Sequence, residues 1–443
     1  IFVFYNVNRA AMRQSSGFPI TSVVSFCCIV NAAVSLIIVN RPSDDEEVRF
    51  DDYRLYRIHP TTPEHNEILM NMGDEEGYSF WSNVGAAHDS ADVMVAPEKI
   101  AKFQTLVDEH RMDVHELMDN VQQFIDQENP LSNTRDAFGW KAYHNLDDIY
   151  RWLDTLASEY PSLISPLVGG ESYEGRNIRG VKLTFRNGNP GVFIEGGIHA
   201  REWISPAVVT YLLNELITST DEHVRTIAES YDWYVFPVFN PDGYVYTHKT
   251  NRLWRKTRKP YTSGCFGADP NRNWNFHWKE NGASSYPCSE TFAGGSAFSE
   301  KETETMSNFI TSVKDKIFTY ISFHSYSQVI LLPYGFSNVH VQNYTDLMEI
   351  GNASRIALAK RYGTSYKVGN IVDILYPASG GSMDWVRGTW NIPITLTYEL
   401  RDTGRFGFLL PASQIIPTGE ETLDSLVALL QEAKRLGYGV RTT

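Results

Sequence analysis

The sequence predicts an α/β fold, in which helices cover both faces of a central β-sheet, preceded by a small α+β domain. Short β-branched runs alternate with longer amphipathic stretches from about residue 136 onward. A strongly acidic block, residues 41–135, precedes them and carries most of the formal net charge of −14. The chain of 443 residues is long enough for two domains with a sizeable core.

The first 40 residues differ in composition from the rest of the chain. They contain no acidic residue, carry Arg9 and Arg13, and then run through the apolar stretch PITSVVSFCCIVNAAVSLIIV. A basic lead, an apolar stretch and small residues near Ala32 and Ala33 are typical of a cleaved secretory signal. We therefore expect a signal peptide over residues 1–40 and a secreted, extracellular protein. The alternative is an uncleaved membrane anchor, because about 20 apolar residues can span a bilayer.

Residues 41–135 are predicted to form a separate domain. This block has 21 acidic and 8 basic residues, whereas residues 136–443 have 32 acidic and 29 basic residues. Such an acidic excess argues against a nucleic-acid partner. Apolar spacing predicts two strands and then two helices, at residues 53–60, 91–96, 96–112 and 114–128. The domain ends in ENPLSNTRDAFGW, whose Pro, Ser and Asn content is typical of a linker.

Residues 136–443 alternate predicted strands with predicted helices. The β-branched and aromatic runs that favour strands are residues 191–198, 232–239, 317–325 and 392–400. The amphipathic runs that favour helices are residues 146–160, 205–217 and 420–437. Strands this apolar indicate a sheet that is buried on both faces. In such sheets ligands bind at the carboxyl ends of the strands, and several polar clusters of the sequence lie there.

Two of the predicted strands end in histidine. His199 follows GVFIEGGI, His324 lies in IFTYISFHS, and Glu202 follows His199 at i+3. Imidazole and carboxylate groups suit Zn²⁺, whose catalytic sites use three protein ligands and leave a fourth position open. Other zinc and serine hydrolase motifs are incomplete in this sequence. HELMD ends in Asp119 instead of histidine, HAREW lacks a second histidine, and GGSMD and GGSAF lack the last glycine of G-x-S-x-G.

Further polar clusters follow in a specific order: HAREW, NRLWRKTR, DPNRNW, HSYSQ, YPASGG and ELRDTGRFGFLLPA. With these motifs the chain closely resembles the zinc metallocarboxypeptidases of the pancreatic A/B type, which are made as secreted procarboxypeptidases. The resemblance covers about Tyr53 to Gly437 and is densest from Ala137 onward. It implies a signal over 1–40, an activation pro-domain with its linker over 41–135, and a catalytic domain with a mixed central sheet over 136–443.

The resemblance implies a catalytic centre with one zinc ion per chain. Its ligands would be His199, Glu202 and His324, and Asp269 would orient His199 through the second ring nitrogen. Glu399 resembles the general base that takes a proton from water. Arg255 resembles the cation that stabilises the oxyanion of the tetrahedral intermediate.

The resemblance also implies a substrate site for a peptide or protein with a free C-terminus. Asn271 and Arg272 resemble the clamp for the terminal carboxylate, because a guanidinium grips a carboxylate through two hydrogen bonds. Tyr376 resembles the loop tyrosine that closes over the bound residue. Arg201 would add charge upstream of the cut bond.

The resemblance implies that the position after GGS, Met383, decides which C-terminal side chain fits. A thioether adapts to apolar shapes and offers no partner to a buried cation, so hydrophobic or aromatic C-terminal residues are expected. Asp384 is expected on an extended segment, where its side chain would face away from the pocket. The pocket implied by the resemblance is lined by Leu331, Gly335, Ile371, Leu375, Ala378, Met383 and Thr397.

Cys265 and Cys288 are the cysteines that remain after removal of the signal. In an exported chain two cysteines most simply form a disulfide, and the alternative is two buried thiols. No Lys or Arg lies between Arg111 and Arg135, so a trypsin-like protease is expected to cut after Arg135. The product would be an active monomer.

Two other classes of protein fit the sequence less well. A secreted binding protein with the same fold but no activity would have lost a catalytic residue, and every motif position is present. A storage or inhibitor protein built on the acidic domain would not need the residues that resemble a catalytic set.

Overall fold

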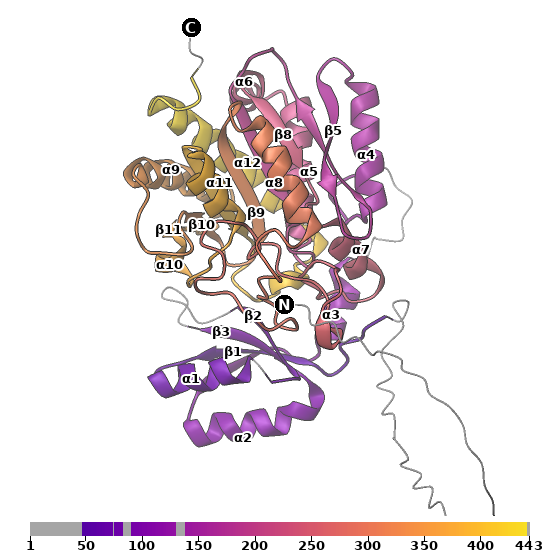
Figure 1. The fold of residues 1–443 in the computed structure, drawn as a ribbon, viewed down its shortest axis with the longest axis vertical. Coiled ribbons are helices and arrows are strands. Elements are labelled where there is room, and N and C mark those ends of the chain that lie inside the picture. The colour runs from indigo at the N-terminus through magenta and orange to yellow at the C-terminus, as the bar shows by residue number, and fades with distance from the viewer. Residues whose placement is uncertain (1–46, 74, 83–89, 130–137, 441–443) are drawn as a thin grey trace, which may run out of the picture. The chain divides into compact units, whose positions relative to one another are not determined.

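The computed structural model describes residues 47–73, 75–82, 90–129 and 138–440. The predicted signal peptide over residues 1–40 and the predicted cleavage site at Arg135 lie outside these residues. Two β-sheets form, one in the acidic block and one in the region that follows it. The sheets can be located by their strand labels in Figure 1.

The acidic block folds around a four-stranded antiparallel sheet in the order β2-β3-β1-β4. The strands are β1 (Arg54–His59), β2 (Tyr78–Ser82), β3 (Ala91–Val95) and β4 (Asp113–Met118). Helices α1 (Pro63–Met72) and α2 (Ile100–His110) bury Leu69 and Phe103 against Tyr56, Ile58 and Val93 of the sheet. The predicted strands at 53–60 and 91–96 and the predicted helix at 96–112 are confirmed.

The single helix predicted over residues 114–128 is wrong in its first part. Residues Asp113–Met118 form the edge strand β4, and helix α3 (Val121–Glu128) starts only after Asn120, whose side chain accepts the N–H of Gln122. The run VHELM is too short for its apolar spacing to distinguish the two structures. The hydrogen bonds of this segment to β1, with Tyr56 opposite Glu116, make it a strand.

The second region has an eight-stranded mixed sheet in the order β11-β10-β12-β9-β7-β8-β6-β5. Its central strands β12, β9, β7 and β8 are parallel, and antiparallel strands flank them. The predicted mixed sheet is therefore confirmed. The strands are β5 (Ile164–Glu171), β6 (Asn177–Leu183), β7 (Gly191–Gly196), β8 (Asp232–Phe236), β9 (Ile317–Ser325), β10 (Val329–Leu332), β11 (Lys367–Asn370) and β12 (Ile394–Leu400).

Helices cover both faces of this sheet (Figure 1). One layer contains α4 (Leu146–Glu159), α5 (Ile204–Thr218), α6 (Glu222–Ser230), α9 (Tyr344–Tyr362) and α12 (Ile415–Arg435). The other contains α8 (Lys301–Val313) and α11 (Ser382–Trp390). The region also has two short α-helices, α7 (Pro241–Lys249) and α10 (Ile371–Ile374), and three 3₁₀ turns at Thr262–Gly264, Gly407–Leu409 and Ala412–Gln414. The acidic block has one 3₁₀ turn, at Pro97–Lys99.

Side chains of the central strands alternate between the two helical layers. Val192 and Ile194 of β7 pack into the core with α5 and α12, whereas Phe193 packs into the core with α8 and α11. This period of two is what a strand buried on both faces requires. His199 follows the end of β7, and His324 and Glu399 are the second-last residues of β9 and β12.

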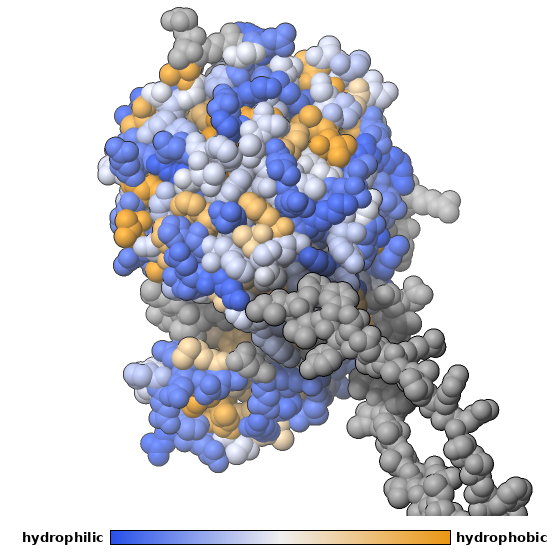
Figure 2. Space-filling view, in the orientation of Figure 1, coloured by the Kyte–Doolittle hydropathy of each residue, from blue (hydrophilic) through white to orange (hydrophobic). Residues whose placement is uncertain are grey.

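Cys265 and Cys288 form a disulfide, as predicted. Among the residues described, no helix combines the length and the apolar content needed to cross a membrane. The face in Figure 2 is largely hydrophilic, and its hydrophobic residues lie in small separate groups. Such a surface is ordinary for a water-exposed globular protein.

Candidate metal and catalytic site

Three buried side chains converge at the carboxyl ends of β7 and β9. Nδ1 of His199 lies 2.8 Å from Glu202 Oε1, Nδ1 of His324 lies 3.1 Å from Glu202 Oε2, and the two Nδ1 atoms are 3.1 Å apart. In the described part of the chain, this is the one group of three His, Cys, Asp or Glu side chains with ligand atoms within 4.8 Å of one another. Two ring nitrogens and a carboxylate facing one point fit a zinc ion.

The turn after β7 brings His199 to His324. Gly197 has a φ of +64°, and a Cβ at this position would lie 3.1 Å from Pro206, so a glycine is required. The hydroxyl of Ser205, in the first turn of α5, accepts the N–H of Gly197 and donates to the carbonyl of Phe323 on β9. This link ties the turn that carries His199 and Glu202 to the strand that carries His324.

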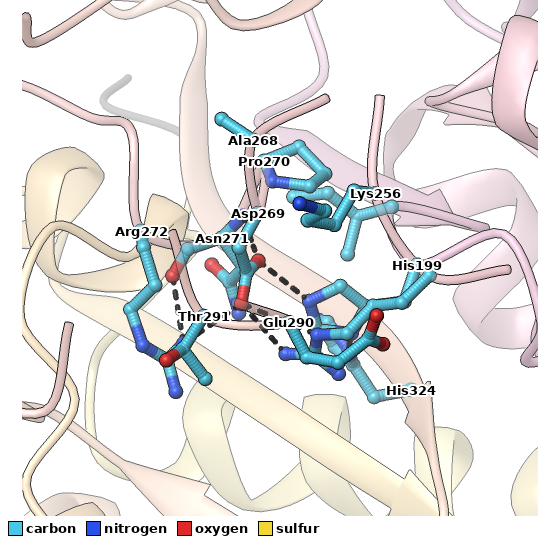
Figure 3. A network of polar contacts seen from close by, with 12 residues as sticks. His199, Lys256, Ala268, Asp269, Pro270, Asn271, Arg272, Glu290, Thr291 and His324 are labelled. Atoms are coloured by element: carbon cyan, nitrogen blue, oxygen red, sulfur yellow. Dashed lines mark hydrogen bonds and ion pairs between the residues drawn. The ribbon is translucent and has the colours of Figure 1, made fainter. Parts of the chain in front are cut away.

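Asp269 lies on the far side of His199 from the metal site (Figure 3). Its Oδ1 is 3.0 Å from Nε2 of His199 and accepts the N–H of Asn271, and its Oδ2 accepts from Arg255 Nη2 at 2.8 Å. Burial alone would raise the pKa of Asp269, but Arg255, His199 and Arg272 lower it well below its usual value. A charged Asp269 favours the His199 tautomer with its proton on Nε2, which leaves Nδ1 for a metal.

Glu399 and Arg255 line the same pocket as His199 and Glu202. Glu399 lies on β12 directly opposite His324 of β9, and burial raises the pKa of its carboxyl. Arg255 is held on Asp269 through Nε and Nη2, and its Nη1 lies 3.7 Å from Glu202 Oε1. One carboxyl and one guanidinium therefore stand beside the metal donors.

Asn271, Arg272, Tyr376 and Met383 also line this pocket. Arg272 donates through Nε to the carbonyl of Gly282 and through Nη1 to the carbonyl of Asn271, both at 2.9 Å. The side-chain oxygen of Asn271 accepts the N–H of Ser382 at 2.9 Å, which directs its amide NH₂ group elsewhere. The structure thus gathers residues from six separate motifs around one pocket.

The prediction for Asp384 is wrong on two counts. Residues 382–384 are not extended, because helix α11 begins at Ser382, and Asp384 is among the residues that line the pocket. Its Oδ2 accepts the N–H groups of Gly335 and Phe336 at 2.8 and 3.2 Å. The sequence held a signal for this helix, since an acidic residue is favoured in a first helical turn.

Arg201 is not among the residues that line the pocket. It is 3% exposed, forms an ion pair with Glu290 at 3.1 Å, and places its guanidinium 4.1 Å from the ring of Phe408. Glu290 is labelled with the site residues in Figure 3. The positive charge of Arg201, which the sequence suggested near the substrate, is therefore paired with Glu290 within the protein. Sequence spacing held no sign of this partner.

Residues of the acidic block also reach this pocket, which the sequence did not predict individually. Trp81 and Ser82 of β2 are among its lining residues, and the Trp81 ring lies 5.2 Å from that of Phe408. The buried carboxylate of Asp92 accepts from Tyr326 Oη at 2.7 Å and binds Arg57 through both oxygens. The acidic block therefore contacts the rim of the site directly.

A second contact between the two regions is a buried ion pair. Glu128, at the end of α3, accepts from Arg252 Nε and Nη2 at 2.7 and 2.5 Å. The Arg252 guanidinium also lies 3.8 Å from the ring of Trp203 and donates to the carbonyl of Phe408. Removing one partner of such a pair leaves an uncompensated buried charge, at a cost of about 3–5 kcal/mol.

The sheet and the donor set together define an α/β protein with a candidate zinc site at the carboxyl ends of its strands. Residues 149–425 match the family model described as zinc carboxypeptidase, and residues 56–128 match the model described as carboxypeptidase activation peptide. The chain therefore belongs to the zinc carboxypeptidase family and is made as a zymogen with an activation peptide. Both matches fall within the predicted domains 41–135 and 136–443, whose exact boundaries remain predictions.

Named relatives agree with this assignment. The chain is 50% identical over 403 residues to zinc carboxypeptidase A 1 of Anopheles gambiae, covering 89% of this chain and 92% of the relative. It is 60% identical over 298 residues to a zinc carboxypeptidase of Simulium vittatum, covering 67% of this chain and 98% of the relative. The crystal structure of carboxypeptidase A from Helicoverpa armigera superposes with a TM-score of 0.80 at 28% identity, covering 88% of this chain and all of that one.

Proposed function

We propose that this protein is secreted as a zymogen and, once activated, removes hydrophobic or aromatic residues from the C-terminus of peptides and proteins. The observation that carries the proposal is a single pocket that joins two of the metal donors, His199 and Glu202, to Arg272, Asn271 and Met383. Hydrolysis of blocked dipeptides tests it, before and after trypsin treatment and with and without a chelator. Cleavage that needs neither activation nor metal would contradict the proposal.

His199, Glu202 and His324 are the proposed ligands of the zinc ion. Bound zinc supplies a Lewis acid that polarises a carbonyl group and makes water easier to deprotonate. Glu399 accepts the proton of the attacking water and returns it to the leaving amine, and its place in the same pocket as His199 and Glu202 suits this role. Arg255 donates to the carbonyl oxygen as negative charge develops on it. Its bonds to Asp269 hold it in place beforehand.

The terminal carboxylate of the substrate is proposed to bind Arg272 and Asn271. Both groups are preorganised, because the Arg272 guanidinium is fixed by two backbone carbonyls and the Asn271 oxygen by one N–H. Tyr376 lines the same pocket and can donate to the bound residue. A charge trap of this kind accepts a chain end and rejects an internal peptide bond, which has no carboxylate. Arg201, paired with Glu290, is proposed to act only at the outer part of a longer substrate.

Met383 is expected to set the preference for the C-terminal residue. It is 3% exposed and lines the pocket with Leu331, Leu375 and Thr397. The carboxyl of the neighbouring Asp384 is buried, and its Oδ2 is already engaged by the N–H groups of Gly335 and Phe336. An incoming Lys or Arg side chain would therefore lack a full countercharge, which is costly in a buried site.

Substrates that end in Phe are therefore expected to be cleaved at least 100-fold better than matched substrates that end in Arg, by kcat/KM, an effect of about 2.7 kcal/mol. Met383→Asp should reverse the direction of this preference, and Met383→Leu is the matched control that should keep it. Equal or better cleavage of the Arg substrate by the unaltered enzyme would overturn the assignment of this pocket.

Activation is proposed to occur by a trypsin-like protease that cuts after Arg135, so that the active enzyme is a monomer beginning Asp136-Ala-Phe. The lining of the pocket by Trp81 and Ser82 supports a pro-domain that covers the site. Arg135→Gln should prevent activation by trypsin, whereas Arg111→Gln, the next basic residue toward the N-terminus, should not. Mass spectrometry and N-terminal sequencing check this. Full activation of Arg135→Gln at the wild-type rate would contradict the assignment.

A further inference from the structure

The two histidines at the metal site differ in what supports their second ring nitrogen. Nε2 of His199 lies 3.0 Å from Asp269. Nε2 of His324 is buried, and no group in the described residues forms a hydrogen bond with it. A histidine that binds a metal almost always donates this N–H to a carboxylate, a carbonyl or a water molecule. A buried N–H left unpaired is costly, so a partner for His324 is to be expected nearby.

Glu195 is a buried carboxylate on the same face of the sheet as His324. It lies on β7 in register with Ser322 of the adjacent strand β9, and His324 is two residues further along β9. Because side chains alternate along a strand, Glu195, Ser322 and His324 point into the same layer. A diagonal pair of this kind lies within reach of long side chains.

One oxygen of Glu195 is anchored and the other is not. Oε1 accepts from the hydroxyls of Ser322 and Tyr320, both of which lie on β9. Oε2 is buried and has no hydrogen-bond partner among the described residues. Burial raises the pKa of Glu195 and the His324 ring opposes this shift, so the two groups are within electrostatic reach of each other. An unpaired acceptor and an unpaired ring nitrogen therefore lie in one buried layer.

We propose that Glu195 is a positioning residue for His324, whose Nε2–H donates to Glu195 Oε2 directly or through one buried water molecule. This bond keeps the His324 proton on Nε2, leaves Nδ1 free for the metal and fixes the plane of the ring. Each of the two histidines then has its own carboxylate, Asp269 for His199 and Glu195 for His324. The inference rests on the proposed role of His324 as a zinc ligand.

The test measures zinc release from the full-length zymogen by a competing chelator, for Glu195→Met and Glu195→Gln. Methionine removes the acceptor at similar volume, and glutamine keeps a weaker, neutral one. Zinc binding is expected to weaken by about 10- to 100-fold in Glu195→Met and by less in Glu195→Gln, as for other second-layer partners of metal ligands. The visible spectrum of the cobalt-substituted protein should shift in the same order.

Glu302 provides the matched control. It is also 0% exposed, accepts one backbone N–H, from Tyr173, and has one oxygen without a partner, but it lies on α8 away from the metal donors. Glu302→Met should leave zinc release and the cobalt spectrum unchanged. Unchanged zinc release in Glu195→Met, or an equal change in Glu302→Met, would overturn the proposal.

Two further variants keep the result interpretable. Ser322→Ala is used if Glu195→Met does not fold, because it removes a donor to Glu195 Oε1. Zinc binding by Ser322→Ala should be weaker than wild type by a few fold. Zinc binding at the wild-type level in this variant would count against the proposal. His324→Ala separates this inference from the proposed function. Zinc retained in His324→Ala would show that the ligand set is wrong, whereas zinc lost in His324→Ala but held normally in both Glu195 variants would refute the role of Glu195 alone.

Discussion

Glu399→Gln is expected to lower kcat by 10²–10⁴ while zinc remains bound, because glutamine has the shape of glutamate but cannot accept a proton from water. Glu399 lies opposite His324 in the strand register and lines the same pocket as His199 and Glu202. Turnover of a blocked dipeptide ending in Phe, together with metal analysis of the same sample, checks the expectation.

Binding of a product-like inhibitor gives the control for Glu399→Gln. The terminal carboxylate is proposed to bind Arg272 and Asn271, whose hydrogen bonds within the protein do not involve Glu399. The inhibitor constant should therefore change by less than the turnover does. A variant that keeps more than about a tenth of the normal kcat would mean that another group acts as the base, because loss of a general base typically costs at least 10².

His324→Ala is expected to abolish measurable activity through loss of zinc. It removes one of three donors that lie within 4.8 Å of one another, and the two that remain cannot close a tetrahedral site. Zinc per chain, measured after passage over a chelating resin, should fall from about one to near zero, and activity should return only in part at high zinc concentration.

His248→Ala is the matched control, since His248 is a partly buried histidine that stacks on Trp203 at 4.1 Å and belongs to no group of metal donors among the described residues. This variant should lose some stability but keep its zinc. Full activity of His324→Ala after exhaustive chelation would remove His324 from the ligand set.

The contrast between β4 and α4 shows where prediction from sequence succeeds. The 14 residues of α4 repeat an apolar face four times, so the periodicity alone identifies the helix, and Asn145 caps it. The run Val114–Met118 covers little more than one helical turn, and its state depends on β1, about 60 residues earlier in the chain. A strand at a sheet edge is defined by its partner, which short-range spacing does not reveal.

The same distinction holds within the candidate site. The sequence by itself determined the elements with long repeats, the acidic block, and the motifs that identify the zinc carboxypeptidase family, because composition, periodicity and local spacing are properties of the chain alone. It could not determine that Arg201 pairs with Glu290, that Asp92 holds Tyr326, or that Glu195 lies one diagonal from His324. These contacts form only when the tertiary structure brings together residues that are 89 to 234 positions apart in the sequence.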